Sequence, residues 1–525
     1  MIVNQLYYCK SICIVKKLNL HIVINFLSSS DYNDAIIYDH LGLICKISLI
    51  FYKIELAKTQ YNKILILILE RTLLMSTQTV KKKYPIGFYF CATTFSFERA
   101  AYYSAKFLIY IFLTASIATG GLGIDQGQAA IMQANLVAFT YLAPIIGGYI
   151  SDRWIGARYT IPVGMFIMGA GYYFGSIATS VSMVNIMIIL VSIGTAFFKG
   201  NVSAVNGQLF DDQDQLDSAF SLQYSFVNIG SFIGTTAVGI LYAKTFVENG
   251  VLGFSQCFFI AALLCVIGGI WFIIGWRFLG DAGKRPFKEG IVSEKTEDAS
   301  SSAPLSGMEK KRIWAIILVS VFSVIFWLFW YLTYLAVYDY GAAFVDMFVG
   351  GFEVPLAWFD SLNALVCIVL GPVLAVVWTK LASRPQGDIS LFRKTGLGLI
   401  FLGLAFLMLV GAELTRGIGA PDTAKASIIW IVFFGILLSI GEMLFSPLGN
   451  SFVSKYAPKK YLGVLMGVWT FATFLAGKGY GYIYAFTLKF DMIKVYTIIP
   501  VILFVAAAIL FVSDKTLSKL VEEEN

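Results

Sequence analysis

Long apolar segments separated by short polar ones fill the chain from residue 85 onward. A hydrocarbon core about 30 Å thick is crossed by about 20 apolar residues in an α-helix that rises 1.5 Å per residue. Twelve segments reach that length, and the pattern therefore predicts an all-α polytopic membrane protein. Their expected spans are 86–117, 129–150, 160–179, 183–204, 218–243, 253–279, 312–338, 357–381, 394–414, 426–450, 461–487 and 492–513.

The longest polar stretch divides these spans six and six. It runs from Asp281 to Met308 and holds a low-complexity piece around Ser300. Such a composition buries little apolar area and predicts a linker. We expect an N-terminal six-helix bundle over 75–280, a cytoplasmic linker over 281–311, a C-terminal six-helix bundle over 312–514 and a cytoplasmic tail over 515–525. Two pseudo-symmetric six-helix bundles around a cleft resemble the major facilitator architecture.

Composition and charge agree with a protein surrounded by lipid. The 525 residues are 58% hydrophobic and 14% charged, whereas soluble domains are nearer a quarter charged. The net charge of +7 does not indicate nucleic-acid binding, because the basic residues lie in short loops between apolar spans. Most of them lie on the side of the amino terminus, which predicts that both termini are cytoplasmic. The opposite side carries only Lys244, Arg416, Lys425, Lys489 and Lys494.

The first 74 residues differ from the rest of the chain. They are rich in Ile, Tyr, Asn and Lys, and their apolar runs, such as Ile64–Leu69, are too short to span a bilayer. Residues 1–74 are therefore a doubtful extension, and we expect translation to start at Met75. The seven cysteines form no C-x-x-C pair, so we expect no disulfide frame, metal site or cofactor.

Ionisable residues inside the spans are the candidate chemistry, because charges are rare in membrane helices and mark functional sites. The first span carries Glu98, and it carries Arg99, Tyr102, Tyr103 and Lys106 at positions i, i+3, i+4 and i+7 on one helix face. That stripe predicts a surface facing water or a polar ligand. Single charges elsewhere could be functional or simply paired with a neighbour. These are Lys199, Asp360, Glu442 and Lys478.

Protons, if they are transported, must bind to carboxylates. The only histidines, His21 and His40, lie in the doubtful extension, so Glu98 and Glu442 are the candidates. A Gly-x-Ser-x-Gly motif, a His-Glu-x-x-His motif and a histidine in the spans are all missing from the sequence. We therefore expect a protein that is not an enzyme.

Eight segments resemble, in order along the chain, motifs of the proton-dependent oligopeptide transporter family. Glu98-Arg99-Ala-Ala-Tyr102-Tyr103 is similar to its helix 1 signature, Glu-x-x-Glu-Arg followed by Tyr-Tyr. The other similar segments are Gly147–Gly156, Phe198–Ser203, Tyr224–Gly230, Phe326–Trp327, Ser361–Asn363, Gly441–Pro447 and Met466–Trp469. The resemblance implies import of di- and tripeptides by proton symport, in a monomer of the bacterial inner membrane.

The resemblance also implies roles for single residues. Glu98, Arg99 and Lys199 would form the proton-coupling group. Cationic side chains would bind the peptide carboxylate, and Glu442 would bind the peptide ammonium. The full substrate-binding set implied in this way is Tyr102, Tyr103, Lys106, Asn228, Asn363, Glu442, Ser446 and Trp469.

The sequence also departs from the family pattern. Phe95 replaces the first acid of the helix 1 signature, and Tyr331 replaces an acid usual on helix 7, so Lys106 is expected to lack a partner across the outer gate. Gly200 stands in place of a proline after Lys199. Asp360 is a gained acid and Lys478 is a gained base.

Alternatives to peptide symport remain open at this stage. A transporter of the same fold could carry nitrate, an amino acid or a peptide-like compound, and the lost acids with the added Lys478 favour a more anionic substrate. A membrane sensor could bind peptides without transporting them. Uptake of labelled dialanine with and without a pH gradient separates these hypotheses.

Overall fold

The structure is a computed structural model, and it describes residues 84–210, 213–284, 305–384, 389–446, 452–453, 455–458 and 461–521. The expectation of a translation start at Met75 lies outside the described residues and stays a prediction. The same holds for the central part of the expected linker, residues 285–304.

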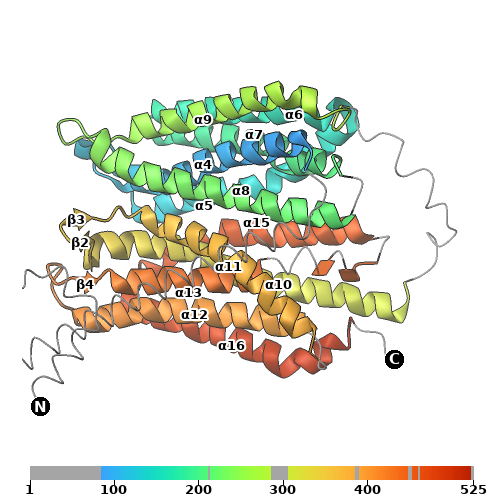
Figure 1. The fold of residues 1–525 in the computed structure, drawn as a ribbon. Helices are drawn as coiled ribbons and strands as arrows, with labels where there is room; N and C mark the ends of the chain where they lie inside the picture. The colour runs from blue at the N-terminus through green and yellow to red at the C-terminus, as the bar shows by residue number, and fades with distance from the viewer. Residues whose placement is uncertain are drawn as a thin grey trace, which may run out of the picture. The chain divides into compact units, whose positions relative to one another are not determined.

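Six long helices form the N-terminal half, drawn in the upper part of Figure 1. Short 3₁₀ or π turns follow four of them, at Ile117–Thr119, Ser151–Ile155, Leu241–Thr245 and Trp276–Phe278. The helices are α4 (Ile86–Thr114), α5 (Gln126–Ile150), α6 (Ala157–Ser176), α7 (Val181–Gly207), α8 (Gln213–Ile240) and α9 (Phe254–Gly275).

Six long helices also form the C-terminal half among the described residues. They are α10 (Gly307–Phe344), α11 (Trp358–Ala382), α12 (Leu391–Arg416), α13 (Ile429–Phe445), α15 (Leu462–Thr487) and α16 (Met492–Ser518). Two pairs of short strands lie where α10 ends. β2 (Phe348–Val349) pairs antiparallel with β3 (Phe352–Glu353), and β1 (Val345–Asp346) pairs parallel with β4 (Ala426–Ser427).

We call the end of the helices that carries these strands the hairpin end. The opposite end, where α9 stops and α10 begins, is the linker end. Because successive helices alternate in direction, α4 and α10 both start at the linker end and finish at the hairpin end, far apart in sequence but with the same sense (Figure 1).

The prediction of a twelve-helix major facilitator architecture is confirmed, with differences at helix ends. α10 is 38 residues long, starting before and ending after the expected span 312–338. Its start lies inside the expected linker, because Ser306 and Glu309 form a capping box that satisfies the free N–H groups of the first turn. Lys310, Lys311 and Arg312 are therefore helical residues.

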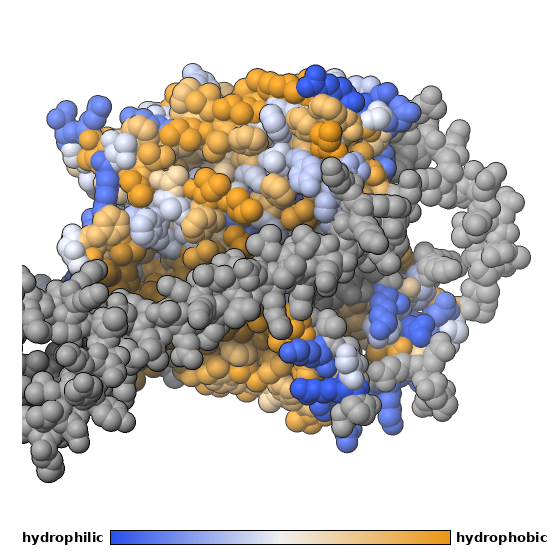
Figure 2. Space-filling model, in the orientation of Figure 1, coloured by the Kyte–Doolittle hydropathy of each residue, from blue (hydrophilic) through white to orange (hydrophobic). Residues whose placement is uncertain are grey.

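The surface of the helices is that of a membrane protein. Eight of the described helices are long and apolar enough to cross a bilayer, and α13 is an apolar helix of 17 residues. Figure 2 shows hydrophobic side chains over the middle of the helices and hydrophilic ones gathered toward their ends. Exposed apolar residues are expected where lipid is the solvent.

The two halves pack against each other through α5 with α15 and through α8 with α11. Small residues allow the first of these contacts: a Cβ on Gly481 would lie 2.6 Å from the carbonyl oxygen of Ala130. Hydrogen bonds between the halves reinforce the hairpin side, where Thr235 and Thr236 of α8 bond the hydroxyl of Ser361 of α11 at 2.8 and 2.9 Å. The halves are therefore joined toward the hairpin end.

Candidate functional site

The expected polar stripe on α4 is present as one continuous set of contacts. The Arg99 guanidinium lies 4.6 Å from the ring centroid of Tyr102 and 5.8 Å from that of Tyr103, and the Lys106 ammonium lies 5.6 Å from the Tyr103 ring. Three of these four side chains are buried, and Tyr103 is partly buried. The four side chains thus share one face of α4, as their helical spacing predicts, and that face points into the protein interior.

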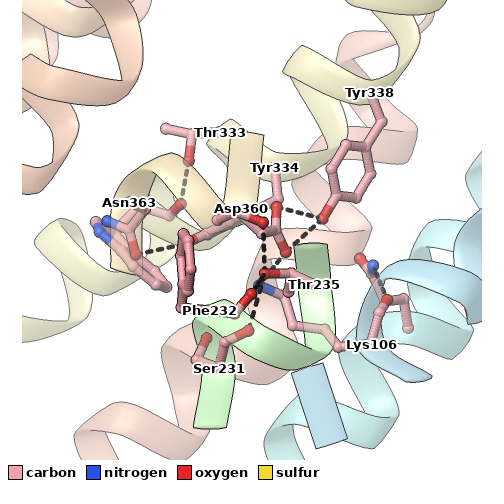
Figure 3. A network of polar contacts seen from close by, with 12 residues as sticks. Lys106, Ser231, Phe232, Thr235, Thr333, Tyr334, Tyr338, Asp360 and Asn363 are labelled. Carbon is pink, nitrogen blue, oxygen red and sulfur yellow. Dashed lines mark hydrogen bonds and ion pairs between the residues drawn. The ribbon is translucent and has the colours of Figure 1, made fainter. Parts of the chain in front are cut away.

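Lys106 has a partner across the two halves, which corrects the expectation that it would lack one. Its Nζ lies 3.8 Å from Asp360 Oδ2 of α11 and 3.3 Å from the ring centroid of Tyr334 of α10. Tyr338 donates to both Asp360 oxygens, at 2.8 and 2.9 Å. Figure 3 shows these side chains converging from α4, α10 and α11, with Thr235 of α8 beside them. The gained acid therefore compensates the buried lysine.

Glu442 of α13 lies in a second polar group, built within the C-terminal half. Asn363 donates to its Oε2 at 2.8 Å and to the Ser439 hydroxyl at 3.0 Å, and the Cys367 thiol approaches the same carboxylate oxygen at 3.7 Å. Tyr334 donates to Asn363 Oδ1 at 3.4 Å. Because Tyr334 also carries Lys106 on its ring face, one tyrosine connects the two polar groups.

A cavity of about 630 Å³ lies between the halves on the linker side of these groups. Its volume falls in the range typical of small-molecule sites. Two residues of the implied substrate-binding set, Asn228 and Ser446, line it, and Cys367 and Met443 line it beside Glu442. The complete lining is Phe220, Ser221, Tyr224, Ser225, Asn228, Cys367, Ile368, Gly371, Pro372, Met443 and Ser446.

The implied proton-coupling residues make two separate sets of contacts. Arg99 makes a two-pronged ion pair with Glu98, with nitrogen–oxygen distances of 2.5 and 2.6 Å, and both side chains are buried. Lys199 of α7 instead lies 3.9 Å from the ring centroid of Tyr141. Phe95, where the family has an acid, packs edge to face on Phe198, with 5.2 Å between ring centroids. Glu98 is thus paired with Arg99 rather than with Lys199.

Two further residues differ from their expected surroundings. Lys478 of α15 donates to Asn135 of α5 and lies beside the exposed rings of Phe139 and Tyr482, at the contact between the halves. It is not among the residues that line the cavity. Trp469 is buried and packs on Phe445, with 6.5 Å between ring centroids.

Sequence analysis missed several participants. Tyr334 and Tyr338 follow Tyr331 on α10 at i+3 and i+7, and Cys367 follows Asn363 on α11 at i+4, so helical spacing from positions named above could have found them. Asp339 of α10 was also missed. It accepts a hydrogen bond from Tyr110 of α4, and no motif marked it.

Comparison with known proteins agrees with this geometry. Uncharacterized transporter YclF of Bacillus subtilis (strain 168) is 28% identical over 445 residues, covering 74% of this chain and 85% of the relative. Peptide transporter YePEPT of Yersinia enterocolitica is 25% identical over 438 residues, covering 74% and 84%. The second of these relatives is named a peptide transporter, and this confirms the resemblance to the oligopeptide transporters that the motifs indicated.

A solved structure shares the fold. The crystal structure of a point mutant of peptide transporter POT in complex with alafosfalin superposes with a TM-score of 0.74 at 24% identity, covering 85% of this chain and 97% of that one. The family model described as Major Facilitator Superfamily matches residues 96–478, from the α4 stripe to Lys478. With its two six-helix halves and the cavity between them, the chain belongs to the Major Facilitator Superfamily.

Proposed function

We propose that this protein is a proton-coupled symporter that imports di- and tripeptides by alternating access. The observation that carries the proposal is Glu442, a buried carboxylate beside a cavity between two halves that are hydrogen-bonded to each other toward the hairpin end. Relatives named peptide transporters cover more than two thirds of the chain and support the same substrate class.

The arrangement of contacts supports alternating access. Ion pairs and hydrogen bonds between described residues of the two halves lie toward the hairpin end, among them Lys106–Asp360 and Thr235–Ser361. The cavity lies toward the linker end, among residues of α8, α11 and α13. This state is closed at the hairpin end, and transport requires a second state in which those contacts separate and the linker end closes.

Opposite charges at the two ends of a peptide suit the polar groups around the cavity. Glu442 would accept the peptide ammonium, and Asn228 and Asn363 would hydrogen-bond its amide groups. Lys106 is paired with Asp360 and lies over Tyr334, whereas Lys199 lies over the ring of Tyr141 and makes no ion pair with a described residue. Lys199 is therefore the better candidate for the peptide carboxylate in this state. The apolar part of the cavity would tolerate varied peptide side chains.

Proton coupling is assigned to Glu98 within this proposal. A carboxylate that gives up its bidentate pair with Arg99 on protonation frees a buried guanidinium, and the two protonation states then favour different arrangements of α4.

The proposal also covers the orientation of the protein and its location in the cell. The excess of basic residues at the linker end supports a cytoplasmic linker end in the inner membrane, and the protein would act as a monomer.

Uptake of labelled dialanine into proteoliposomes that contain the purified full-length protein tests the function. We expect accumulation when the outside is more acidic than the lumen, and only slow equilibration when the pH is equal on both sides. Absence of dialanine uptake, together with saturable uptake of nitrate or of a single amino acid, would replace peptides by another substrate. Binding without uptake of any of these would indicate a sensor.

A further inference from the structure

A second pocket, of about 270 Å³, lies at the hairpin end of the molecule. It is distinct from the cavity beside Glu442, because its lining comes from the ends of α10 and α15 and the starts of α5 and α16. Among these lining residues, Asp339 of α10 is the one carboxylate. Its side chain therefore meets the hairpin-end pocket rather than the substrate cavity.

Asp339 accepts hydrogen bonds from one tyrosine of each half, and the bond from Tyr110 joins the two halves. Tyr110 of α4, in the N-terminal half, donates to Asp339 Oδ2 at 2.6 Å, and Tyr484 of α15, in the C-terminal half, donates to the same oxygen. Both tyrosines are buried. Separating the halves at the hairpin end must break the bond from Tyr110, so the carboxylate contributes to keeping that end closed.

Asp339 differs from the two buried acids described at this end, Asp360 and Glu413, in having no cation beside it. Among the described residues it makes no ion pair, whereas Asp360 has Lys106 and Glu413 has Arg416. The titratable groups facing it are phenols: Tyr110 from α4, Tyr484 from α15 and Tyr496 from α16. Its neighbour Tyr340 turns away and donates to Glu413 of α12, and α5 contributes the neutral Gln126.

We propose that Asp339 is a proton-binding site that is reached through the hairpin-end pocket, and that its ionised form latches the two halves together there. A proton from water in the pocket binds Oδ1, the oxygen to which none of the described tyrosines donates, and the carboxylate becomes a neutral acid. Hydrogen bonds to an ionised acceptor are roughly twice as strong as those to a neutral one. Protonation therefore weakens both phenol bonds and favours the state that is open at the hairpin end.

This inference rests on the proposed alternating access, and it adds a second protonation site to the Glu98 group. The two sites differ in exposure: Glu98 is fully paired and buried in α4, whereas Asp339 is half-buried and lines a pocket. With the linker end in the cytoplasm, Asp339 would sample the outer pH while the substrate cavity is open toward the other side.

A distance measurement on the full-length protein tests the latch without relying on transport. Spin labels are placed at Ile117 in the N-terminal half and Ile418 in the C-terminal half, which are 79% and 64% exposed at the hairpin end, in a background with the native cysteines replaced. In nanodiscs, acidification should lengthen this distance in the otherwise unchanged protein. In Asp339→Asn the distance between the two labels should be long at every pH. At neutral pH the fraction of molecules open at the hairpin end should rise about tenfold over the parent protein.

Matched variants decide between a latch and general damage. Glu413→Gln removes another buried acid at the same end that bonds a tyrosine but does not cross the halves, so its pH response should match that of the parent protein. If Asp339→Asn does not fold, Tyr110→Phe and Tyr484→Phe together should open the hairpin end at neutral pH. The proposal is overturned if Asp339→Asn, or this double variant, keeps the distances and the pH response of the parent. Failure to transport dialanine would refute the proposed function and leave this measurement unaffected.

Discussion

Single residues at this site are defined by their partners, and the two acids Glu442 and Glu98 show two different kinds of pairing. Glu442 accepts from the neutral groups Asn363 and Cys367, so its charge is left available to an ammonium ligand. Glu98 is saturated by Arg99, so its charge is already balanced. This difference separates a binding role from a coupling role and leads to two predictions.

Glu442→Gln should lower dialanine uptake by at least about tenfold, while the protein still folds. The glutamine carbonyl can accept the hydrogen bond from Asn363, so the local structure survives, but the charge-assisted bond to an ammonium, worth ~1.5 kcal/mol or more, is lost. Uptake per folded molecule measures this, with Glu413→Gln as the control acid away from the cavity. Near-normal uptake by Glu442→Gln would remove that residue from the binding site.

Glu98→Gln should keep peptide exchange across the membrane but lose accumulation driven by a pH gradient. The amide mimics a permanently protonated acid and can accept only one of the two Arg99 bonds. Counterflow and gradient-driven uptake in the same vesicles measure the two activities separately. Accumulation at the parent level would assign coupling to Asp360, Glu442 or Asp339 instead, and loss of both activities together with poor expression would indicate a structural pair.

At the scale of helices, close approach between α4 and α8 depends on glycine. A Cβ on Gly230 would lie 2.4 Å from the Ser96 carbonyl oxygen, and one on Gly234 would lie 2.3 Å from that of Ala100.

Two of the motif segments are joined to each other by hydrogen bonds. Asn201 of α7 donates to the Ser151 hydroxyl at 2.6 Å and to that of Thr160 at 3.0 Å, joining the motif on α7 to the loop after α5.

Gly234→Ala should lower the stability of the protein by about 1–3 kcal/mol, because the added Cβ must push α8 away from α4. Gly200→Ala is the matched control: it is also a helix glycine, but nothing lies within 4 Å of its added Cβ. The control should be neutral or slightly more stable, since alanine favours the helix by ~1 kcal/mol over glycine. Thermal unfolding in detergent measures both, and equal midpoints would contradict the packing argument.

At the scale of the whole molecule, the pair of Lys106 and Asp360 links the halves through buried charges. Removing one member leaves an unpaired buried ion, which costs ~3–5 kcal/mol, whereas replacing both by apolar residues of similar size is often neutral. Lys106→Met and Asp360→Leu should therefore each destabilise the protein, and the double variant should recover most of the loss. Unfolding midpoints of the four proteins test this, and additive losses would show that the two charges do not interact.

Much of the architecture followed from the sequence alone. Apolar segments about 20 residues long, separated by basic loops, require helices that cross a bilayer, because backbone groups in lipid must be hydrogen-bonded within the chain. The α4 stripe followed from the 3.6-residue period. The positions of Glu442 and Asn228 by the cavity were implied by motifs, and the first of the six-helix halves had to end before the polar stretch at Asp281.

Tertiary structure alone decided which charges meet. Lys106 and Asp360 are 254 positions apart in the chain, and Tyr110 and Asp339 are 229 apart, so no local pattern connects them. The spacing of residues along one helix shows which of them share a face, but it does not show which helix packs against that face. Whether the halves touch at the hairpin end also depends on which conformation the transporter adopts. For this reason the sequence indicated a gained acid at Asp360 but did not mark Asp339. In the packed structure Asp360 pairs with Lys106, whereas Asp339 accepts hydrogen bonds from Tyr110 and Tyr484.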